Sequence, residues 1–390
     1  MGRIETTVFV SYRRTNVPWA LAISKELTHS GYDVFFDYTG IASGDFERVI
    51  LENIRARAHF LVLLTPSALE RCSEPGDVFR LEIETALRLE RNIVPLMLEG
   101  FAFNTRGIGD QLTGRLADLK RYNALLVPVD YFDEAMSRLR DRYLNVALDS
   151  VLHPLSPALR ALSSVHQAAA VNAPAVAKQE LAAQQYFERA HDAASPSEEE
   201  RLLSQAIRLQ PDFAEALAAR GLIRAQDRRD VAGARQDLDA AVRLKFHSTD
   251  KQAVAFFGRA RLRDMEGDTI GARADYDAAI RFKPDYAAPF SYRGHLRVQL
   301  GESIGAREDY DTAVRLDPQR AETFLLRGYL RQQQGDAVGA QEDYATASRL
   351  NPTLGAQLSD ARGNPASRER KAREVKAQKK RHAARPRRKR

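Results

Sequence analysis

The chain has 390 residues, 44% of them hydrophobic and 28% charged, which is typical of globular domains and not of fibrous or disordered chains. This length predicts two or more domains. The longest purely apolar runs, such as residues 60–64, have only five residues and are too short for a membrane span, and no secretory signal pattern opens the chain. The single cysteine, Cys72, excludes an internal disulfide framework and favours a reducing compartment, so a cytoplasmic location is expected.

The net charge of +7 and the pI of about 9.4 come from one end of the chain. Residues 362–390 contain 14 Lys and Arg against 2 acidic residues, whereas the other residues contain 45 against 50. The body is therefore mildly acidic. Residues 363–390 have almost no apolar side chains and are expected to be a disordered basic tail. Its charge suits nonspecific binding to nucleic acid or an anionic membrane surface, and the alternative is a tail that only solubilises the chain.

Residues 1–148 alternate short apolar runs with segments of helical periodicity. The runs typical of buried strands are residues 7–11, 32–37, 60–64, 92–97 and 124–129. The segments with helical spacing are residues 17–30, 45–57, 76–87 and 132–147. This alternation predicts an α/β domain with a parallel sheet covered on both faces. In such sheets ligands bind at the carboxyl ends of the strands.

One predicted helix carries two candidate acidic side chains. Phe79, Ile83 and Ala86 form its apolar stripe, and Asp77 is a plausible cap at its start. Glu82 and Glu84 flank the stripe, each about 100° away on opposite sides. Only one of them can face a given cleft, and the spacing does not choose between them.

The segments that follow the predicted strands suit a phosphorylated, ring-containing ligand. They carry cations (Arg13 and Arg14), a glycine-bearing loop and aromatic side chains (Phe101 and Phe103). No dinucleotide fingerprint or Walker motif accompanies them. The eight histidines show no metal-ligand spacing, so neither a metal nor a cofactor is expected. Cys72 has no histidine nearby and is not expected to be a nucleophile.

Five motifs carry a family resemblance. They are VFVSYRR (8–14), DVFFD (33–37), GDF (44–46), LVLLTPSALERC (61–72) and EIETAL…NIVPL (82–96). In this order and spacing, residues 6–145 resemble a Toll/interleukin-1 receptor (TIR) domain, most closely the NAD-cleaving type. The resemblance implies a flavodoxin-like five-stranded parallel sheet and NAD+ as a substrate. It also implies cleavage to nicotinamide and ADP-ribose or a cyclic form, and self-association through the TIR domain.

The resemblance also assigns roles to residues. It places the catalytic glutamate on Glu82 and not on Glu84. It makes residues 38–46 a loop that gates the site, and Val78 stands where the family commonly has tryptophan. The positions that it implies for substrate binding are Tyr12, Arg13, Arg14, Gly44, Phe46, Val78 and Phe103. One carboxylate is enough for this chemistry, because nicotinamide leaves as a neutral group and only the positive charge on the ribose needs stabilisation.

The C-terminal half contains an internal repeat. Residues 149–178, rich in Ala, Ser, Pro and Val, are a predicted linker with one short helix at about 158–169. In residues 179–362, Gly267, Gly301 and Gly335 are 34 residues apart, which resembles tetratricopeptide (TPR) repeats and predicts an all-α solenoid of antiparallel helix pairs. Arginines recur at two positions of each first helix. They either line a groove for acidic peptides or form salt bridges between repeats with Asp275, Asp309 and Asp343.

We therefore expect an NAD+ glycohydrolase in an immune or defence-type signalling protein. Its TPR repeats would regulate or scaffold it by binding a protein or peptide partner. The alternative function is that of a non-catalytic adaptor acting through TIR and TPR contacts. In that case Glu82 belongs to a solvated helix face, Arg13 and Arg14 form surface ion pairs, and Phe103 belongs to the core.

Overall fold

The structure is a computed structural model that describes residues 5–37, 46–98, 100–148, 151–226 and 230–353. The basic tail therefore lies outside the described residues. Contacts divide the chain into two compact units, Met1–Lys251 and Gln252–Arg390. The first unit contains the α/β domain and the helices that follow it as far as Lys251. The second contains the later helix pairs.

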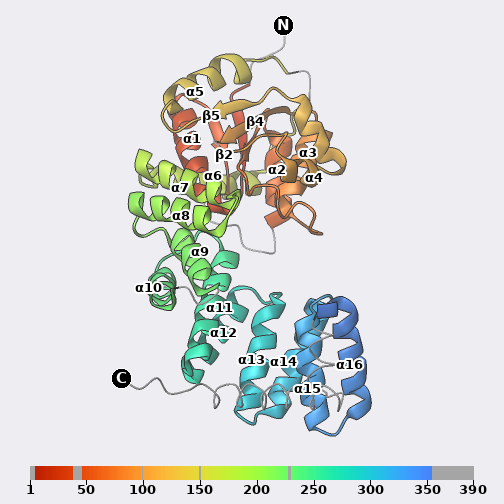
Figure 1. Cartoon of the computed structure of the whole chain (residues 1–390). Coiled ribbons are helices and arrows are strands. Elements are labelled where there is room, and N and C mark those ends of the chain that lie inside the picture. Colours follow the sequence, from red (N-terminus) through yellow and green to blue (C-terminus); the bar gives the residue numbers. More distant parts are fainter. Residues whose placement is uncertain (1–4, 38–45, 99, 149–150, 227–229, 354–390) are drawn as a thin grey trace, which may run out of the picture. The chain divides into compact units, whose positions relative to one another are not determined.

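The α/β domain is built on one parallel sheet (Figure 1). Its strands are β1 (Thr7–Ser11), β2 (Asp33–Phe35), β3 (His59–Leu64), β4 (Asn92–Leu98) and β5 (Leu125–Val127). Their order is β2-β1-β3-β4-β5, and every neighbouring pair is parallel. The predicted five-stranded parallel sheet is confirmed. Because β2 lies on one side of β1 and β3 on the other, the chain order reverses between β1 and β3, where such sheets bind ligands.

Helices cover both faces of the sheet. On one face lie α1 (Val17–His29), α5 (Phe132–Arg138) and the π-helical segment η3 (Leu139–Leu144). On the other lie α2 (Phe46–Ala56), α3 (Val78–Arg88), α4 (Arg106–Gln111) and the 3-10 segment η2 (Gly114–Arg121). Alternate residues of β1 enter the two cores, since Val8 packs with the first group and Phe9 with the second.

Part of the expected linker is a well-packed helix. Helix α6 (Pro157–Asn172) begins at Ser156, whose hydroxyl accepts a hydrogen bond from the backbone of Leu159, and it is longer than the short helix expected there. It packs against α1, α2 and β2. Leu159 joins the core on one face of the sheet and Ala170 joins the core on the other. Residues 157–172 therefore extend the α/β domain.

Antiparallel helix pairs follow (Figure 1). In chain order they are α7 (Lys178–His191) with α8 (Pro196–Leu209), α9 (Ala214–Ala225) with α10 (Val231–Ala241), α11 (Thr249–Glu266) with α12 (Thr269–Phe282), α13 (Ala287–Gln299) with α14 (Ser303–Leu316), and α15 (Ala321–Gln333) with α16 (Ala337–Leu350). Gly267, Gly301 and Gly335 follow the first helix of three successive pairs with φ of +84°, +78° and +83°. This left-handed conformation ends a helix and favours glycine. The predicted helical repeat is confirmed.

Small residues let the paired helices approach closely. A Cβ on Gly294 of α13 would lie 2.9 Å from the ring of Tyr310 on α14, so the glycine makes room for the tyrosine. Ala306 and Ala313 of α14 are fully buried. Gly328 and Tyr344 repeat the arrangement one pair later, also at 2.9 Å. Tyr310 is only 1% exposed and fills the space between its two helices.

The recurring arginines are engaged inside the repeats. Arg293 donates to both carboxylate oxygens of Asp309 at 3.0 and 2.6 Å, and Arg297 donates to the same carboxylate at 2.9 Å. Asp309 itself is only 3% exposed. The same pattern joins Arg220 and Arg224 to Asp237, Arg259 and Arg263 to Asp275, and Arg327 and Arg331 to Asp343. The expected ion pairs with Asp275, Asp309 and Asp343 occur, but they join the two helices of one repeat and not neighbouring repeats.

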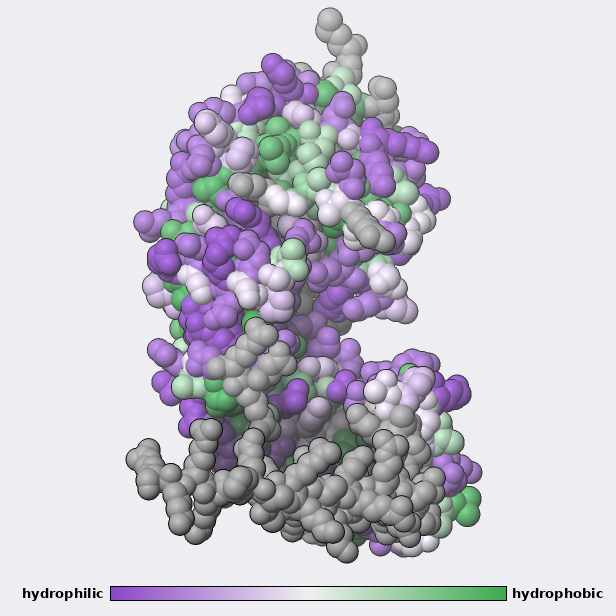
Figure 2. Space-filling model, in the orientation of Figure 1, coloured by the Kyte–Doolittle hydropathy of each residue, from purple (hydrophilic) through white to green (hydrophobic). Residues whose placement is uncertain are grey.

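The outer surface is dominated by hydrophilic residues, with apolar residues in small scattered patches on the face that Figure 2 shows. Among the described residues, no helix combines the length and the apolar character that a membrane span requires.

Candidate active site

The candidate site lies at the carboxyl ends of β1 and β3. After Ser11 ends β1, the chain passes through residues 12–13 and the 3-10 turn η1 (Arg14–Asn16) into α1. After β3, residues 65–77 lead into α3. Asp77 caps that helix, as predicted, because its carboxylate accepts the backbone N–H of Arg80 at 2.9 Å. The predicted apolar stripe of α3 is buried, so the helix has a fixed rotation about its axis.

This rotation separates the two glutamates. Glu82 is 8% exposed and faces the end of β1, where the Ser11 hydroxyl donates to Glu82 Oε2 at 2.5 Å. Glu84 lies on the other side of α3 and pairs with Arg80 at 2.8 Å in a partly exposed ion pair. Within the described residues, Glu82 accepts a hydrogen bond from Ser11 and has no ion-pair partner. Of the two candidates, Glu82 is the one at the point where the strand order reverses.

Burial changes the acidity of this carboxyl group. Desolvation raises the pKa of Glu82 to about 8, and the negative charge of Asp37 adds to the rise. The hydrogen bond from Ser11 and the nearby charges of Arg13 and Arg14 act in the opposite direction. In this state Glu82 is therefore mostly protonated at neutral pH. A carboxyl group with a strongly shifted pKa at the carboxyl ends of a parallel sheet is a feature of functional sites.

Arg13 ties the end of β1 to the start of α3. Its Nη1 and Nη2 contact the Asp77 carboxylate at 2.5 and 3.1 Å, and its Nε donates to the carbonyl of Ala68 at 2.6 Å. The guanidinium also stacks over Phe79 at 4.8 Å from the ring centre. This guanidinium is thus bound to residues 68–79 of the same domain.

Arg14 and Tyr12 converge on Asp37. The phenol of Tyr12 donates to the Asp37 carbonyl at 2.7 Å, and Arg14 Nη1 donates to the same carbonyl at 2.6 Å. Arg14 also forms an ion pair with the Asp37 carboxylate. Asp37 immediately precedes the predicted gating loop. Gly44 and the side chain of Phe46 lie outside the described residues.

The remaining two predicted site residues lie further along the chain. Phe103 is half-buried and packs edge-on against Phe101, with ring centres 5.1 Å apart, beside the core under α3. Val78 is the first residue of α3 and is half-buried, one turn before Glu82. The structure brings Tyr12, Arg14 and Glu82 to the ends of β1 and β3. It gives Phe103 a packing contact instead of a contact with Glu82.

Several residues at this edge were not singled out from the sequence. Ser11 and Asp37 are polar residues at the ends of two buried apolar runs. Their position at strand ends could have indicated that they belong to the site. Gln184 and Glu188 come from α7, where Gln184 donates to Asn16 at 3.2 Å and Glu188 accepts from the Ser67 hydroxyl at 2.7 Å. These pairs are separated by 168 and 121 positions, so no local pattern indicates them.

Cys72 is buried in the core beneath α3, where Nη2 of Arg13 contacts its sulfur. Burial raises the pKa of the Cys72 thiol to about 12, so this cysteine is not an activated nucleophile. No group of three or more His, Cys, Asp or Glu side chains among the described residues is placed to hold a metal ion.

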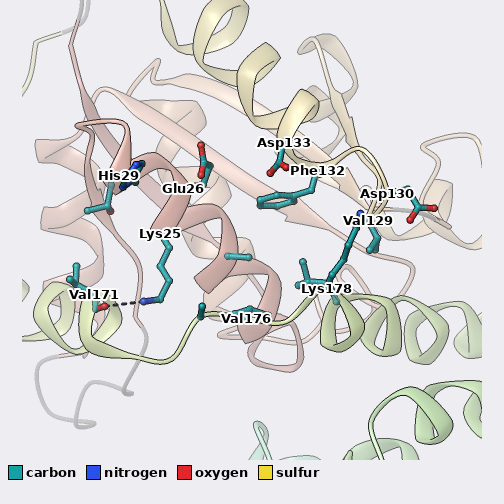
Figure 3. A pocket seen from close by; sticks show the side chains of 14 residues that line it. Lys25, Glu26, His29, Val129, Asp130, Phe132, Asp133, Val171, Val176 and Lys178 are labelled. Atoms are coloured by element: carbon teal, nitrogen blue, oxygen red, sulfur yellow. Dashed lines mark hydrogen bonds between the residues drawn. The ribbon is translucent and has the colours of Figure 1, made fainter.

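A separate pocket of about 620 Å³ lies between α1, the start of α5 and the connection from α6 to α7 (Figure 3). Lys25, which lines it, donates to the carbonyl of Val171 at 2.9 Å, as the dashed line shows. Lys178 and Asp133 also line it, so its charges are of both signs. Glu82 is not among its lining residues.

Comparisons with known proteins agree with this geometry. The sequence model of the TIR domain family matches residues 8–140. NAD(+) hydrolase tir-1 of Caenorhabditis elegans is 32% identical over 136 residues, and NAD(+) hydrolase sarm1 of Drosophila melanogaster is 32% identical over 142 residues. The matched regions are 34% and 35% of this chain but only 14% and 10% of those relatives.

Solved structures align at low similarity. MamA is 18% identical, with a TM-score of 0.36, over 44% of this chain and 96% of the MamA chain. YrrB, described as a TPR protein with an unusual peptide-binding site, is 16% identical, with a TM-score of 0.35, over 45% of this chain and 90% of its own. The family match, the strand order and the five motifs coincide on one segment. Residues 8–140 of this chain are a TIR domain.

Proposed function

We propose that the TIR domain hydrolyses NAD+ at the bond between nicotinamide and ribose, with Glu82 as the catalytic carboxylate. The observation that carries the proposal is a buried glutamate at the end of the central strands, hydrogen-bonded to Ser11 and close to two arginines. The names of the C. elegans and D. melanogaster relatives support the same substrate.

The reaction needs one negative charge. As the bond from C1′ of the ribose to the pyridinium nitrogen breaks, its electron pair leaves with nicotinamide, which becomes neutral. Positive charge develops on the ribose, where the Glu82 carboxylate stabilises it. Water then adds at C1′ and loses a proton, giving ADP-ribose. Glu82 must be ionised for this role, and the positive pyridinium ring of the bound substrate lowers its pKa in that direction.

We assign the two arginines different tasks. The side chain of Arg14 is 36% exposed, so it is accessible to the substrate pyrophosphate, which competes with Asp37 for the guanidinium. Arg13 is engaged with Asp77 and positions α3. We also propose that Tyr12, Val78 and Phe103 contact the bound substrate. Gly44 and Phe46 belong to the loop that we propose gates it.

Nicotinamide release from NAD+ tests the assignment. Glu82→Gln keeps the shape of the side chain and removes its charge, so we expect the rate to fall at least about 100-fold. Glu84→Gln is the matched control, because it makes the same change on the opposite side of the same helix, and its rate should stay within about twofold. Equal rates for the wild type and Glu82→Gln would exclude Glu82 as the catalytic group.

The second candidate function is a non-catalytic signalling adaptor. It is favoured by the engagement of Arg13 and Arg14 with internal carboxylates and by Val78 in place of the family tryptophan. Absence of nicotinamide release by the full chain, even after clustering on a surface, would select this function. In both cases we propose that the TIR domain self-associates and that the TPR repeats bind a protein or peptide.

A further inference from the structure

Helix α7 holds the loops at the catalytic edge of the TIR domain. We propose that it is an autoinhibitory clamp that keeps the domain in a closed, slow state until α7 is released. We use the name α7 clamp for Gln184, Glu188 and Arg189 together with the loop residues that they contact. The inference rests on the proposed NAD+ hydrolase function and names how that activity is controlled.

The contacts of the clamp are buried and polar. Gln184, 1% exposed, donates to Asn16 at the start of α1. Glu188, 2% exposed, accepts from the backbone N–H and the hydroxyl of Ser67 at 3.3 and 2.7 Å. The Cγ of Arg189 lies 3.3 Å from the position of a Cβ on Gly100. The clamp therefore touches the segments that follow β1, β3 and β4, which is the edge where a parallel sheet binds its ligand.

The segment between β3 and α3 receives further contacts from the helical region of the first unit. His191, at the end of α7, lies 3.6 Å from the Glu70 carboxylate. Arg71 pairs with Asp250 at the start of α11. Together with the bonds to Ser67, these contacts hold one side of residues 65–77.

Arg13 holds the same segment from inside the TIR domain. It bonds to the carbonyl of Ala68, contacts Cys72 Sγ at 3.4 Å and pairs with Asp77, the cap of the helix that carries Glu82. A continuous series of contacts thus runs from α7 through residues 65–77 to α3. Movement of α7 therefore changes what holds the catalytic helix in place.

In the clamped state the groups that would meet the substrate are already engaged. Arg14 pairs with Asp37, and His166 of α6 lies 3.6 Å from that same carboxylate. Glu82 is buried against Ser11. Admitting a molecule as large as NAD+ requires these loops to rearrange. The α7 clamp fixes the segments that follow β1, β3 and β4 and so opposes their rearrangement, which is why we expect it to inhibit the reaction.

The clamp is also poised for release. Glu188 carries a carboxylate into a buried contact, where its partners are Ser67 and, at 3.5 Å, Gln184. Among the described residues, no cation forms an ion pair with it. Burying a carboxylate without a cation costs free energy, so docking of α7 is weaker than its buried area alone would make it.

The test uses the full chain and nicotinamide release from NAD+. Glu188→Ala removes both bonds to Ser67, and Ser67→Ala removes the bond from the hydroxyl. Each variant should raise the rate between about 5-fold and 150-fold. The double variant should gain no more than Glu188→Ala alone, because that variant already loses both bonds to Ser67. Glu188→Gln keeps an acceptor for Ser67 without the charge and should be slower than wild type. Gln179→Ala, on the exposed side of α7, is the matched control and should leave the rate unchanged.

Hydrogen exchange of residues 65–77 provides a readout that does not depend on activity, and it should increase in Glu188→Ala. Unchanged exchange would overturn the clamp. Increased exchange with an unchanged rate would overturn its inhibitory role and leave the hydrolase intact. If no variant releases nicotinamide, binding of carba-NAD, which cannot be hydrolysed, decides. Tighter binding by Glu188→Ala than by wild type supports the clamp while the hydrolase fails, and equal binding overturns both.

Discussion

Buried acidic side chains have different hydrogen-bond partners in the two regions of the molecule. In the repeats, Asp309 is almost fully buried and receives hydrogen bonds from two guanidinium groups. In the TIR domain, Glu82 is buried to a similar extent, but its hydrogen bond comes from the uncharged Ser11. The charge of Asp309 is satisfied by the bonded cations, whereas burial of Glu82 without a bonded cation has a free-energy cost and raises its pKa. The contrast separates a structural carboxylate from a candidate catalytic one.

Removing the buried aspartate from an ion pair of the repeats should have the largest effect on stability. Asp309→Ala leaves Arg293 and Arg297 partly buried without their shared acceptor, so the free energy of unfolding should fall by about 3 kcal/mol. Asp277→Ala is the control, because Asp277 is about half exposed and pairs with the same Arg293, and it should cost less than about 1 kcal/mol. Urea denaturation followed by circular dichroism measures both. Equal losses of unfolding free energy would mean that the burial of Asp309 does not make it more important than the exposed Asp277.

The pH dependence of turnover tests the role of the buried carboxyl group of Glu82. With a pKa of about 8, Glu82 is ionised in only a small fraction of the free enzyme at pH 6. Hence kcat/KM should rise roughly 50-fold between pH 6 and pH 8 and level off above. The residual activity of Glu82→Gln should show no such rise. A flat wild-type profile over this range would mean that the carboxyl titrates normally or is not required.

A smaller effect should appear in thermal stability. The folded pKa of Glu82 lies above its unfolded value, so the folded state binds the proton more tightly. The stability contributed by the protonated group is therefore present at pH 4 and is lost as the pH rises toward 8. Glu82→Gln removes this loss, and its Tm relative to wild type should be about 5 °C higher at pH 9 than at pH 5. For Glu84→Gln the difference from wild type should be the same at both pH values.

Local and periodic features were determined by the sequence itself. Apolar runs predict all five strands, Asp77 predicts the start of α3, and the 34-residue spacing of Gly267, Gly301 and Gly335 predicts the helix pairs. These features depend on backbone preferences and on which residues share a face within one element. Neighbours along the chain specify both, so they can be read without knowing the fold. The ends of the elements were less accurate, as the closing helix shows by ending in the π-helical η3.

Only the tertiary structure decided which groups meet at the strand ends. Spacing left Glu82 and Glu84 equivalent, and the fixed rotation of α3 against the sheet separates them. The sequence suggests that Arg13 is available to a substrate, but in the structure its guanidinium is paired with Asp77. The contact of Glu188 with Ser67 joins residues 121 positions apart. Such contacts depend on how whole elements pack together. The residues that neighbour each partner along the chain do not indicate them.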